Sequence, residues 1–238
     1  MTYSDRFYSY QTKARGLLDP KSLEALFDKL NSYYWARFGR YLPRNKRIKC
    51  LDVASGYGNF VYFLRARGYV NVQGYDLDEN QVALARSLNL PVEVGNVFDV
   101  MARGHRYELI SAFDFIEHLS KDKALNFLDG CFESLEIGGA LIIRTPSADG
   151  PFGSHDSFND ITHEWAMSST LLIDILKMVG FSKVTLLDER PQPTSVINFL
   201  RWLVHFPVRM LANLICVGIG MMPPRVWTRS MIAIAYKY

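Results

Sequence analysis

The fold is decided by the stretch Ile48-Lys49-Cys50-Leu51-Asp52-Val53-Ala54-Ser55-Gly56-Tyr57-Gly58-Asn59-Phe60. Its apolar first half is typical of a buried strand, and its small residues form a turn that enters a helix. Gly56 and Gly58 let the backbone approach a ligand closely, because a Cβ there would collide with it. Asp76 lies eighteen residues after Gly58, at the end of the next expected strand, where its carboxylate can accept both hydroxyls of a ribose. These features predict a nucleoside-binding strand, turn and helix.

Strand and helix patterns alternate beyond this stretch. The strand patterns cover residues 48–53, 72–76, 92–95, 109–113, 140–144, 184–187 and 231–237. The helix patterns cover 59–67, 78–88, 120–135 and 168–179, and Gly138-Gly139 is expected to close the third of them. Such alternation requires a parallel sheet that is wound on both faces. The predicted fold class is therefore α/β, doubly wound.

The chain divides according to the same patterns. Asp19-Pro20 starts a further helix, so residues 1–45 are expected to form an N-terminal helical cap. The core covers 46–190 and contains a long loop at 145–167. An apolar insertion covers 191–230, and residues 231–238 return to the core as its final strand.

Composition bounds the function only loosely. The chain has 238 residues, a net charge of +3 and three cysteines, Cys50, Cys131 and Cys216. With no CxxC pair among them, neither a disulfide framework nor a zinc knuckle is indicated. The first eleven residues lack the apolar run of a secretory signal, so we expect a cytoplasmic protein.

The glycine loop chooses between two nucleoside cofactors. A dinucleotide site needs a third Gly or Ala three residues after the second glycine, and Val61 stands there, which argues against NAD. The spacing Asp-x-Ala-Ser-Gly-x-Gly instead resembles motif I of class I S-adenosylmethionine-dependent methyltransferases. Three later segments resemble the same family in order: Val94–Val97, Ser111–Leu119 and Leu135–Ile143. The alternative is that the glycine loop is a tight strand–helix turn that binds no ligand, and that Asp76 follows it by coincidence.

The resemblance covers about residues 45–188 and implies a Rossmann-like, mostly parallel seven-stranded sheet with a final antiparallel strand. It also implies S-adenosylmethionine as the cofactor, with Asp52 orienting its amino group. The loop backbone would contact the methionyl part, Asp76 the ribose, Asn96 the adenine, and Phe113 would help to close the methionine pocket. The expected cofactor-binding residues are Asp52, Ala54, Gly56, Tyr57, Gly58, Asp76, Leu77, Asn96, Val97 and Phe113.

Three of the five histidines follow strands at the edge where an acceptor is expected. Methyl transfer to an alcohol requires that its proton be removed, and a histidine near its ordinary pKa suits that task. We predict His163 as the base, oriented by Asp160 or Glu164. His118 is the second candidate, and His155 lies in the same loop. The alternative is that these histidines only pack or bond to backbone.

The loop at 145–167 could also bind a metal ion. His155, Asp156, Asp160, His163 and Glu164 offer imidazole and carboxylate ligands. Their spacing matches no compact ligand motif, and such clusters are more often hydrogen-bonded polar contacts. No metal is therefore predicted.

The acceptor is inferred from resemblance alone. Arg144-Thr145-Pro146, residues 151–155 and Thr162-His163-Glu164 look like a bacterial subgroup linked to surface-glycan or glycolipid assembly, which implies O-methylation of a sugar hydroxyl. An aromatic O-methyltransferase of quinone biosynthesis is the first alternative, and a binding module without catalysis is another. An RNA or protein methyltransferase using the basic, aromatic segment 29–49 is a third alternative. No Asn/Asp-Pro-Pro-Tyr element is present, so no nucleic-acid partner is expected.

The insertion carries a second amphipathic pattern. Asn198, Arg201, His205, Arg209 and Asn213 would share one face of a helix within 195–222. Pro207 is expected to kink or split that helix. The charge-free run 210–224 is shorter than the roughly 20 residues that span a bilayer. We therefore predict a surface-lying amphipathic helix. Contact with a membrane or glycolipid at the inner membrane face, docking of the acceptor, ordinary packing and a second subunit are equal alternatives for what it binds.

Overall fold

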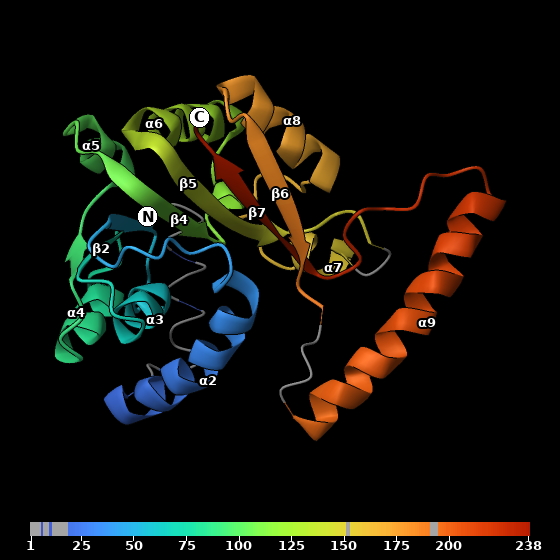
Figure 1. The fold of residues 1–238 in the computed structure, drawn as a ribbon, viewed down its shortest axis with the longest axis horizontal. Helices are drawn as coiled ribbons and strands as arrows, with labels where there is room; N and C mark the ends of the chain where they lie inside the picture. The colour runs from blue at the N-terminus through green and yellow to red at the C-terminus, as the bar shows by residue number, and fades with distance from the viewer. Residues whose placement is uncertain (1–5, 7–9, 11–18, 151–152, 191–194) are drawn as a thin grey trace.

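The computed structural model describes residues 6, 10, 19–150, 153–190 and 195–238. Among these residues, seven strands form one sheet in the order β3-β2-β1-β4-β5-β7-β6 (Figure 1). The strands are β1 Lys49–Val53, β2 Asn71–Asp76, β3 Val92–Val94, β4 Tyr107–Phe113, β5 Leu135–Pro146, β6 Lys183–Asp188 and β7 Ser230–Tyr236. All neighbouring pairs are parallel except those made by β7, which runs antiparallel to both β5 and β6. The predicted doubly wound sheet with one antiparallel strand is confirmed.

Helices cover both faces of the sheet. The helices α2 Pro20–Phe38, α3 Asn59–Ala66 and α4 Glu79–Ser87 pack over one apolar core, and α5 Val97–Ala102, α6 Lys121–Ser134 and α8 Ser169–Val179 over the other. A short 3₁₀ turn, Ile116–His118, and the helix α7 Gly153–Phe158 lie in the connections. Because β4 pairs in parallel with both β1 and β5, the carboxyl ends of these three strands meet at one edge of the sheet.

The caps that start two helices follow the sequence rules. The Asp19 carboxylate accepts from the backbone N–H of Lys21 and Ser22, and Asp78 accepts from Asn80 and Gln81. The Gln81 side chain donates to the Asp78 carboxylate at 3.2 Å, whereas the Asp78 backbone N–H donates to Asp76, so the reciprocal half of a capping box does not form. The starts of α2 and α4 are therefore local properties of the sequence.

The Gly138-Gly139 prediction is wrong. The helix α6 ends at Ser134, and β5 begins at the next residue. Gly138 has a φ of 83°, and the register between β4 and β5 shifts beside it, between Tyr107 and Leu109. The two glycines thus form an irregularity within a strand instead of a helix end. Two short helices, α5 and α7, were not predicted because neither has a long apolar period.

The insertion forms one helix, α9 Val196–Gly218, which stands to one side of the sheet (Figure 1). The predicted split at Pro207 is wrong, because the helix is continuous through this residue, and the kink stays a prediction. Proline removes one backbone hydrogen bond, and 22 other residues maintain the helix around it. By length and composition, α9 is also the one helix among the described residues that could cross a membrane.

Candidate active site

A cavity of about 560 Å³ opens at the carboxyl ends of β1 and β4. The expected cofactor residues Asp52, Ala54, Gly56, Tyr57 and Phe113 all line it. Two buried polar atoms in its wall, Ser55 Oγ and Asn59 Oδ1, have no hydrogen-bond partner within the described protein. Unpartnered buried polar groups cost free energy, so these atoms indicate a ligand with polar groups of its own.

Asp52 is the charged end of this cavity. It is 3% exposed and accepts a hydrogen bond of 2.5 Å from Ser111 Oγ on β4. Burial raises the pKa of Asp52 to about 7, with the Ser111 hydrogen bond opposing the shift and Asp76 adding to it. A buried carboxylate of this kind is well suited to bind an ammonium group, because the cation would restore its ionised form.

The backbone of the glycine loop is unusual at three positions. Ala54, Gly56 and Gly58 have φ values of 49°, 54° and 81°. A Cβ on Gly56 would meet Gln81 Oε1 at 2.8 Å, whereas a Cβ on Gly58 would meet Leu90 and Val92. Gly58 is therefore needed for close packing of the loop against α4 and β3, and Gly56 is the glycine whose backbone faces the cavity.

Asp76 lies behind the loop at the end of β2. Its two carboxylate oxygens accept from the backbone N–H of Gly56, at 2.7 Å, and of Asp78, at 2.8 Å. Burial raises the pKa of Asp76 above its usual range, and these two hydrogen bonds oppose the shift. Each oxygen retains a second lone pair, so the carboxylate can position the loop and still accept from a ligand hydroxyl.

Five of the ten expected cofactor residues do not line the cavity: Gly58 and Asp76, described above, and Leu77, Asn96 and Val97. Leu77 is 68% exposed, and Val97 is buried in the core between the sheet and α6. The Asn96 side chain caps α5, accepting from the N–H of Phe98 at 3.0 Å. Their proximity to a bound adenine stays a prediction.

The N-terminal helix α2 forms one wall of the first cavity. Leu30, Tyr33 and Tyr34 of α2 line it, so two aromatic residues of the basic segment cover the cavity. Two basic side chains of this segment make contacts within the protein. Arg37 is buried and donates to the carbonyls of Glu189 and Arg190, and Lys46 lies 3.8 Å from the centre of the Tyr69 ring.

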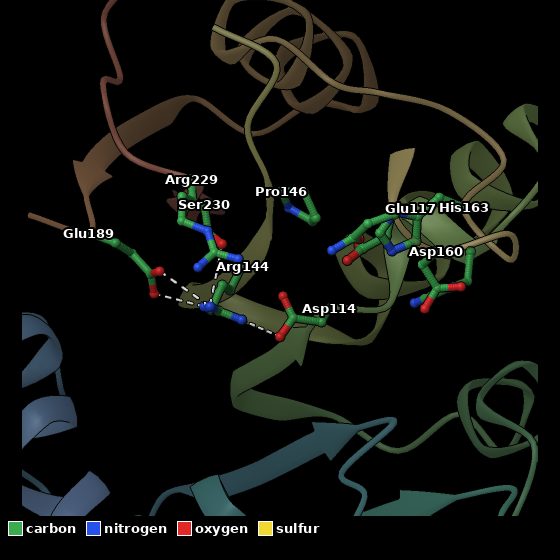
Figure 2. Close-up of a pocket in the computed structure, with 11 residues that line it drawn as sticks. Asp114, Glu117, Arg144, Pro146, Asp160, His163, Glu189, Arg229 and Ser230 are labelled. Carbon is green, nitrogen blue, oxygen red and sulfur yellow. Dashed lines mark hydrogen bonds and ion pairs between the residues drawn. The ribbon is translucent and has the colours of Figure 1, made fainter. Parts of the chain in front are cut away.

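A second cavity, of about 400 Å³, adjoins the first (Figure 2). Asp114 and Arg144 line both cavities and form an ion pair with each other. The remaining lining residues are Glu117, His118, Pro146, Asn159, Asp160, His163, Glu189, Arg229 and Ser230. Three of the five predicted catalytic residues, His163, His118 and Asp160, are thus brought together beside the cofactor cavity.

Arg144 connects the surrounding elements. Its guanidinium donates to both carboxylate oxygens of Glu189, at 2.7 and 3.2 Å, and to Ser230 Oγ at 3.3 Å (Figure 2). Glu189 in turn accepts from the hydroxyl of Tyr33 on α2. This network fixes the ends of β5, β6 and β7 against the N-terminal helix, and sequence motifs alone did not single out Glu189, Ser230 or Arg229.

The two histidines are held by their Nδ1 atoms. The Thr162 hydroxyl donates to Asp160 at 2.6 Å, so its oxygen accepts at 2.9 Å from His118 Nδ1. His163 Nδ1 is 3.1 Å from the carbonyl of Ser157, which can only accept. In the neutral form of each ring, therefore, Nε2 carries the lone pair. The rings are 4.8 Å apart, and burial, followed by the proximity of His163, lowers the pKa of His118.

The predicted orientation of His163 is corrected by this arrangement. Asp160 acts on His118 through Thr162, and His163 is oriented by a backbone carbonyl. Glu164 is exposed, and its backbone N–H donates to the carbonyl of Glu117. His155 lies on α7 outside both cavities, 3.5 Å from the Asn159 amide. The side chain of Asp156 lies outside the described residues.

Glu117 is a further residue of the second cavity that the sequence did not single out. It is 2% exposed, accepts from Thr145 Oγ1 at 3.0 Å, and its other oxygen has no partner in the described protein. Burial, aided by Asp114, raises the pKa of Glu117 to about 8. Glu117, His118 and His163 offer ligand atoms within 4.8 Å of one another, so these three residues could hold a divalent cation. The metal-ligand cluster considered in the sequence, at residues 155–164, has only His163 in common with these three residues.

Comparison with known proteins identifies the fold's relatives. A methyltransferase-domain family matches residues 26–186. A SAM-dependent methyltransferase from Archaeoglobus fulgidus is 18% identical, with a TM-score of 0.67 over 97% of this chain and 99% of that one. A putative O-methyltransferase from Nostoc punctiforme is 16% identical, with a TM-score of 0.59 over 92% and 58%. The Haemonchus contortus phosphoethanolamine N-methyltransferase 2 bound to S-adenosyl-L-methionine is 14% identical, with a TM-score of 0.57 over 88% and 52%. No curated protein matches.

Proposed function

Since the chain belongs to the methyltransferase-domain family and uses S-adenosylmethionine as its cofactor, we propose that it methylates a hydroxyl group of a sugar. One observation carries this proposal: ten of the eleven residues that line the second cavity are polar or charged, Pro146 being the exception. A ring of hydroxyls can bond to many of these side chains. An aromatic acceptor would leave them unpartnered on removal from water.

The proposed reaction is a direct in-line displacement. The acceptor oxygen forms a bond to the methyl carbon as the bond from that carbon to sulfur breaks, and the leaving group is S-adenosylhomocysteine. The acceptor hydroxyl passes its proton to His163 Nε2, which holds the lone pair in the neutral ring. Alignment supplies most of the rate, because a sulfonium needs no acid assistance.

Asp114 and Arg144 have a positioning role in this proposal. They lie between the methionyl end of the first cavity and the acceptor in the second, so they determine the approach of oxygen to methyl. The Glu189 carboxylate and Ser230 fix the Arg144 guanidinium in the plane where it meets Asp114. We infer that this pair also bonds the sugar hydroxyl next to the one methylated.

The experiment is methyl transfer from labelled S-adenosylmethionine to two acceptor sets, bacterial glycans or glycolipids and catechols. We expect labelled glycan and no labelled catechol. The His163→Ala variant should bind S-adenosylhomocysteine normally and lose roughly 100-fold or more in turnover. His105→Ala is the matched control, since His105 is exposed and lines neither cavity. Transfer to catechol alone would show that the acceptor is aromatic.

Methyl transfer in the presence of the chelator EDTA tests whether His163 acts as the base. We expect turnover to survive EDTA, because a base needs no metal. Loss of turnover with EDTA and recovery with Mg²⁺ would instead show that Glu117, His118 and His163 bind a cation that activates the hydroxyl. That result would contradict the role of His163 as the base, but it would not contradict the proposal that the acceptor is a sugar.

A further inference from the structure

The helix α9 exposes an apolar surface that no described part of the protein covers. Its 23 residues include none that are buried. The exposed apolar side chains lie along its whole length: Val196, Ile197, Phe199, Leu200, Trp202, Leu203, Val204, Phe206, Val208, Met210, Leu211, Leu214, Ile215 and Val217. An apolar surface of this extent is not stable against water and indicates a partner.

The polar face of α9 is turned toward the protein. Asn198, His205, Arg209, Asn213 and Cys216 are the half-buried positions, together with Ala212, at the spacing of one helical face. Arg209 donates to Asp188, at the end of β6, at 2.7 Å. The helix is thus amphipathic in the opposite sense to an ordinary surface helix, whose apolar face would be the inner one.

Charge identifies the partner. From residue 190 to residue 238 the sequence contains six Lys/Arg and no Asp or Glu. Arg201 and Arg225 flank the apolar surface, and Trp202 lies on it. Basic residues, an amphipathic tryptophan and an apolar helix are together complementary to the head groups and outer acyl chains of an anionic bilayer.

We propose that α9 lies in the plane of an anionic membrane surface, with its apolar side among the outer acyl chains and its polar side bound to the protein. At 1.5 Å per residue the helix is about 35 Å long, enough to cross a bilayer core of about 30 Å. Arg209 is near its middle, however, and is bound to Asp188. A spanning α9 would draw this ion pair and the end of β6 into hydrocarbon, so the pair favours the in-plane orientation.

The attachment of α9 places the second cavity beside the membrane. Asp188 binds α9, and the next residue, Glu189, lines that cavity. Arg229 and Ser230, which follow α9 in the chain, line it too. If the proposed sugar methylation holds, the sugar is carried by a lipid, since its hydroxyl must reach a cavity at the level of the head groups. The membrane contact itself does not depend on that acceptor.

The test is co-sedimentation of the full-length protein with vesicles of phosphatidylcholine alone or mixed with phosphatidylglycerol. We expect binding to the anionic vesicles, and binding to pure phosphatidylcholine weaker by about tenfold or more. The double variant Leu211→Glu, Leu214→Glu should lose roughly tenfold in binding for each substitution. Its matched control is Ile137→Glu, Met178→Glu, which changes two side chains that are as exposed but lie away from α9. Calorimetric binding of S-adenosylhomocysteine shows that each variant is folded.

Three outcomes would overturn the proposal. Wild-type protein that fails to sediment with anionic vesicles has no membrane surface. A wild-type dimer that the α9 variant converts to a monomer would show that a second copy covers the helix. Resistance to alkaline carbonate extraction would show a spanning helix. Because none of these measurements uses methyl transfer, a wrong acceptor leaves them unaffected.

Discussion

Asp188 and Glu189 are consecutive residues whose carboxylates bind parts of the protein on either side of the active site. Asp188 accepts from Arg209 of α9, from the backbone N–H of Trp227 and from Thr228. Glu189 accepts from Arg144 and from Tyr33 of α2. The end of β6 therefore joins the proposed membrane helix to the helix that covers the cofactor cavity.

Because Asp188 and Glu189 are adjacent but bind different parts of the protein, we predict that substitutions at the two positions have different effects. Glu189→Ala should weaken S-adenosylhomocysteine binding by about tenfold, because Tyr33 and Arg144 lose their acceptor and α2 loosens over the cavity. Asp188→Ala should leave that binding unchanged and make the segment 219–229 more sensitive to protease. Calorimetry and limited proteolysis of both variants measure the two effects. Equal loss of cofactor binding in both would contradict a separation of roles.

Cofactor binding should depend on pH through Asp52. Its pKa of about 7 lies far above the ordinary value, so in the empty cavity it is protonated at pH 6 and ionised at pH 8. An ammonium ligand requires the carboxylate, and below the pKa binding must release a proton. Affinity for S-adenosylhomocysteine should therefore be about tenfold weaker at pH 6 than at pH 8. Titration calorimetry in two buffers of different ionisation enthalpy measures the proton release, and Asp52→Asn should bind weakly at every pH.

Thr162 should act as a positioning residue for His118. Thr162→Val removes the hydroxyl that accepts from His118 Nδ1 at 2.9 Å and keeps the longer contact of 3.3 Å to the Thr162 carbonyl. Turnover should fall about fivefold, the value of one ordinary hydrogen bond, and the pH profile of kcat/KM should shift. S-adenosylhomocysteine binding should not change. Thr170→Val, at an exposed position of α8, is the control.

Alanine substitutions at Gly58 and Gly104 distinguish two causes of lost stability, which are backbone strain and steric crowding. Both have positive φ, 81° and 72°, but a Cβ on Gly58 would lie 3.0 Å from Leu90 Cδ1, and one on Gly104 would meet nothing within 4 Å. Gly104→Ala should cost about 1 kcal/mol of unfolding free energy from the backbone alone. Gly58→Ala should cost about 2–3 kcal/mol, since crowding is added. Chemical denaturation of both variants measures the difference, and equal losses would mean that Leu90 and Val92 move aside.

The sequence predicted those parts of the protein that depend on local pattern. The alternation of strands and helices, the caps at Asp19 and Asp78 and the placement of Gly56 at a cavity follow from periodicity and spacing, and the family resemblance implied the placement of Asp52. The continuous α9 was not predicted, because a proline rule applied to an exposed helix overestimates the break.

The second cavity depended on long-range contacts that no local pattern contains. Glu117 follows β4, and its oxygen contacts Thr145 on β5, 28 residues later. Glu189 meets Arg144 across 45 residues. Asp160 was assigned to His163 because the two are near in sequence, but the chain turns so that Asp160 bonds Thr162 and thereby His118. Residue type identified the chemistry of this edge, and only the fold determined the partners.

The antiparallel strand β7 also has a consequence for the order of synthesis. It lies between β5 and β6 and pairs with both over seven and six residues, yet it follows α9 in the chain. A ribosome therefore makes the apolar helix while β6 still has no partner and the sheet is still open. The helix is made before Arg229 and Ser230, which line the second cavity, so the proposed membrane contact can form before that cavity is complete.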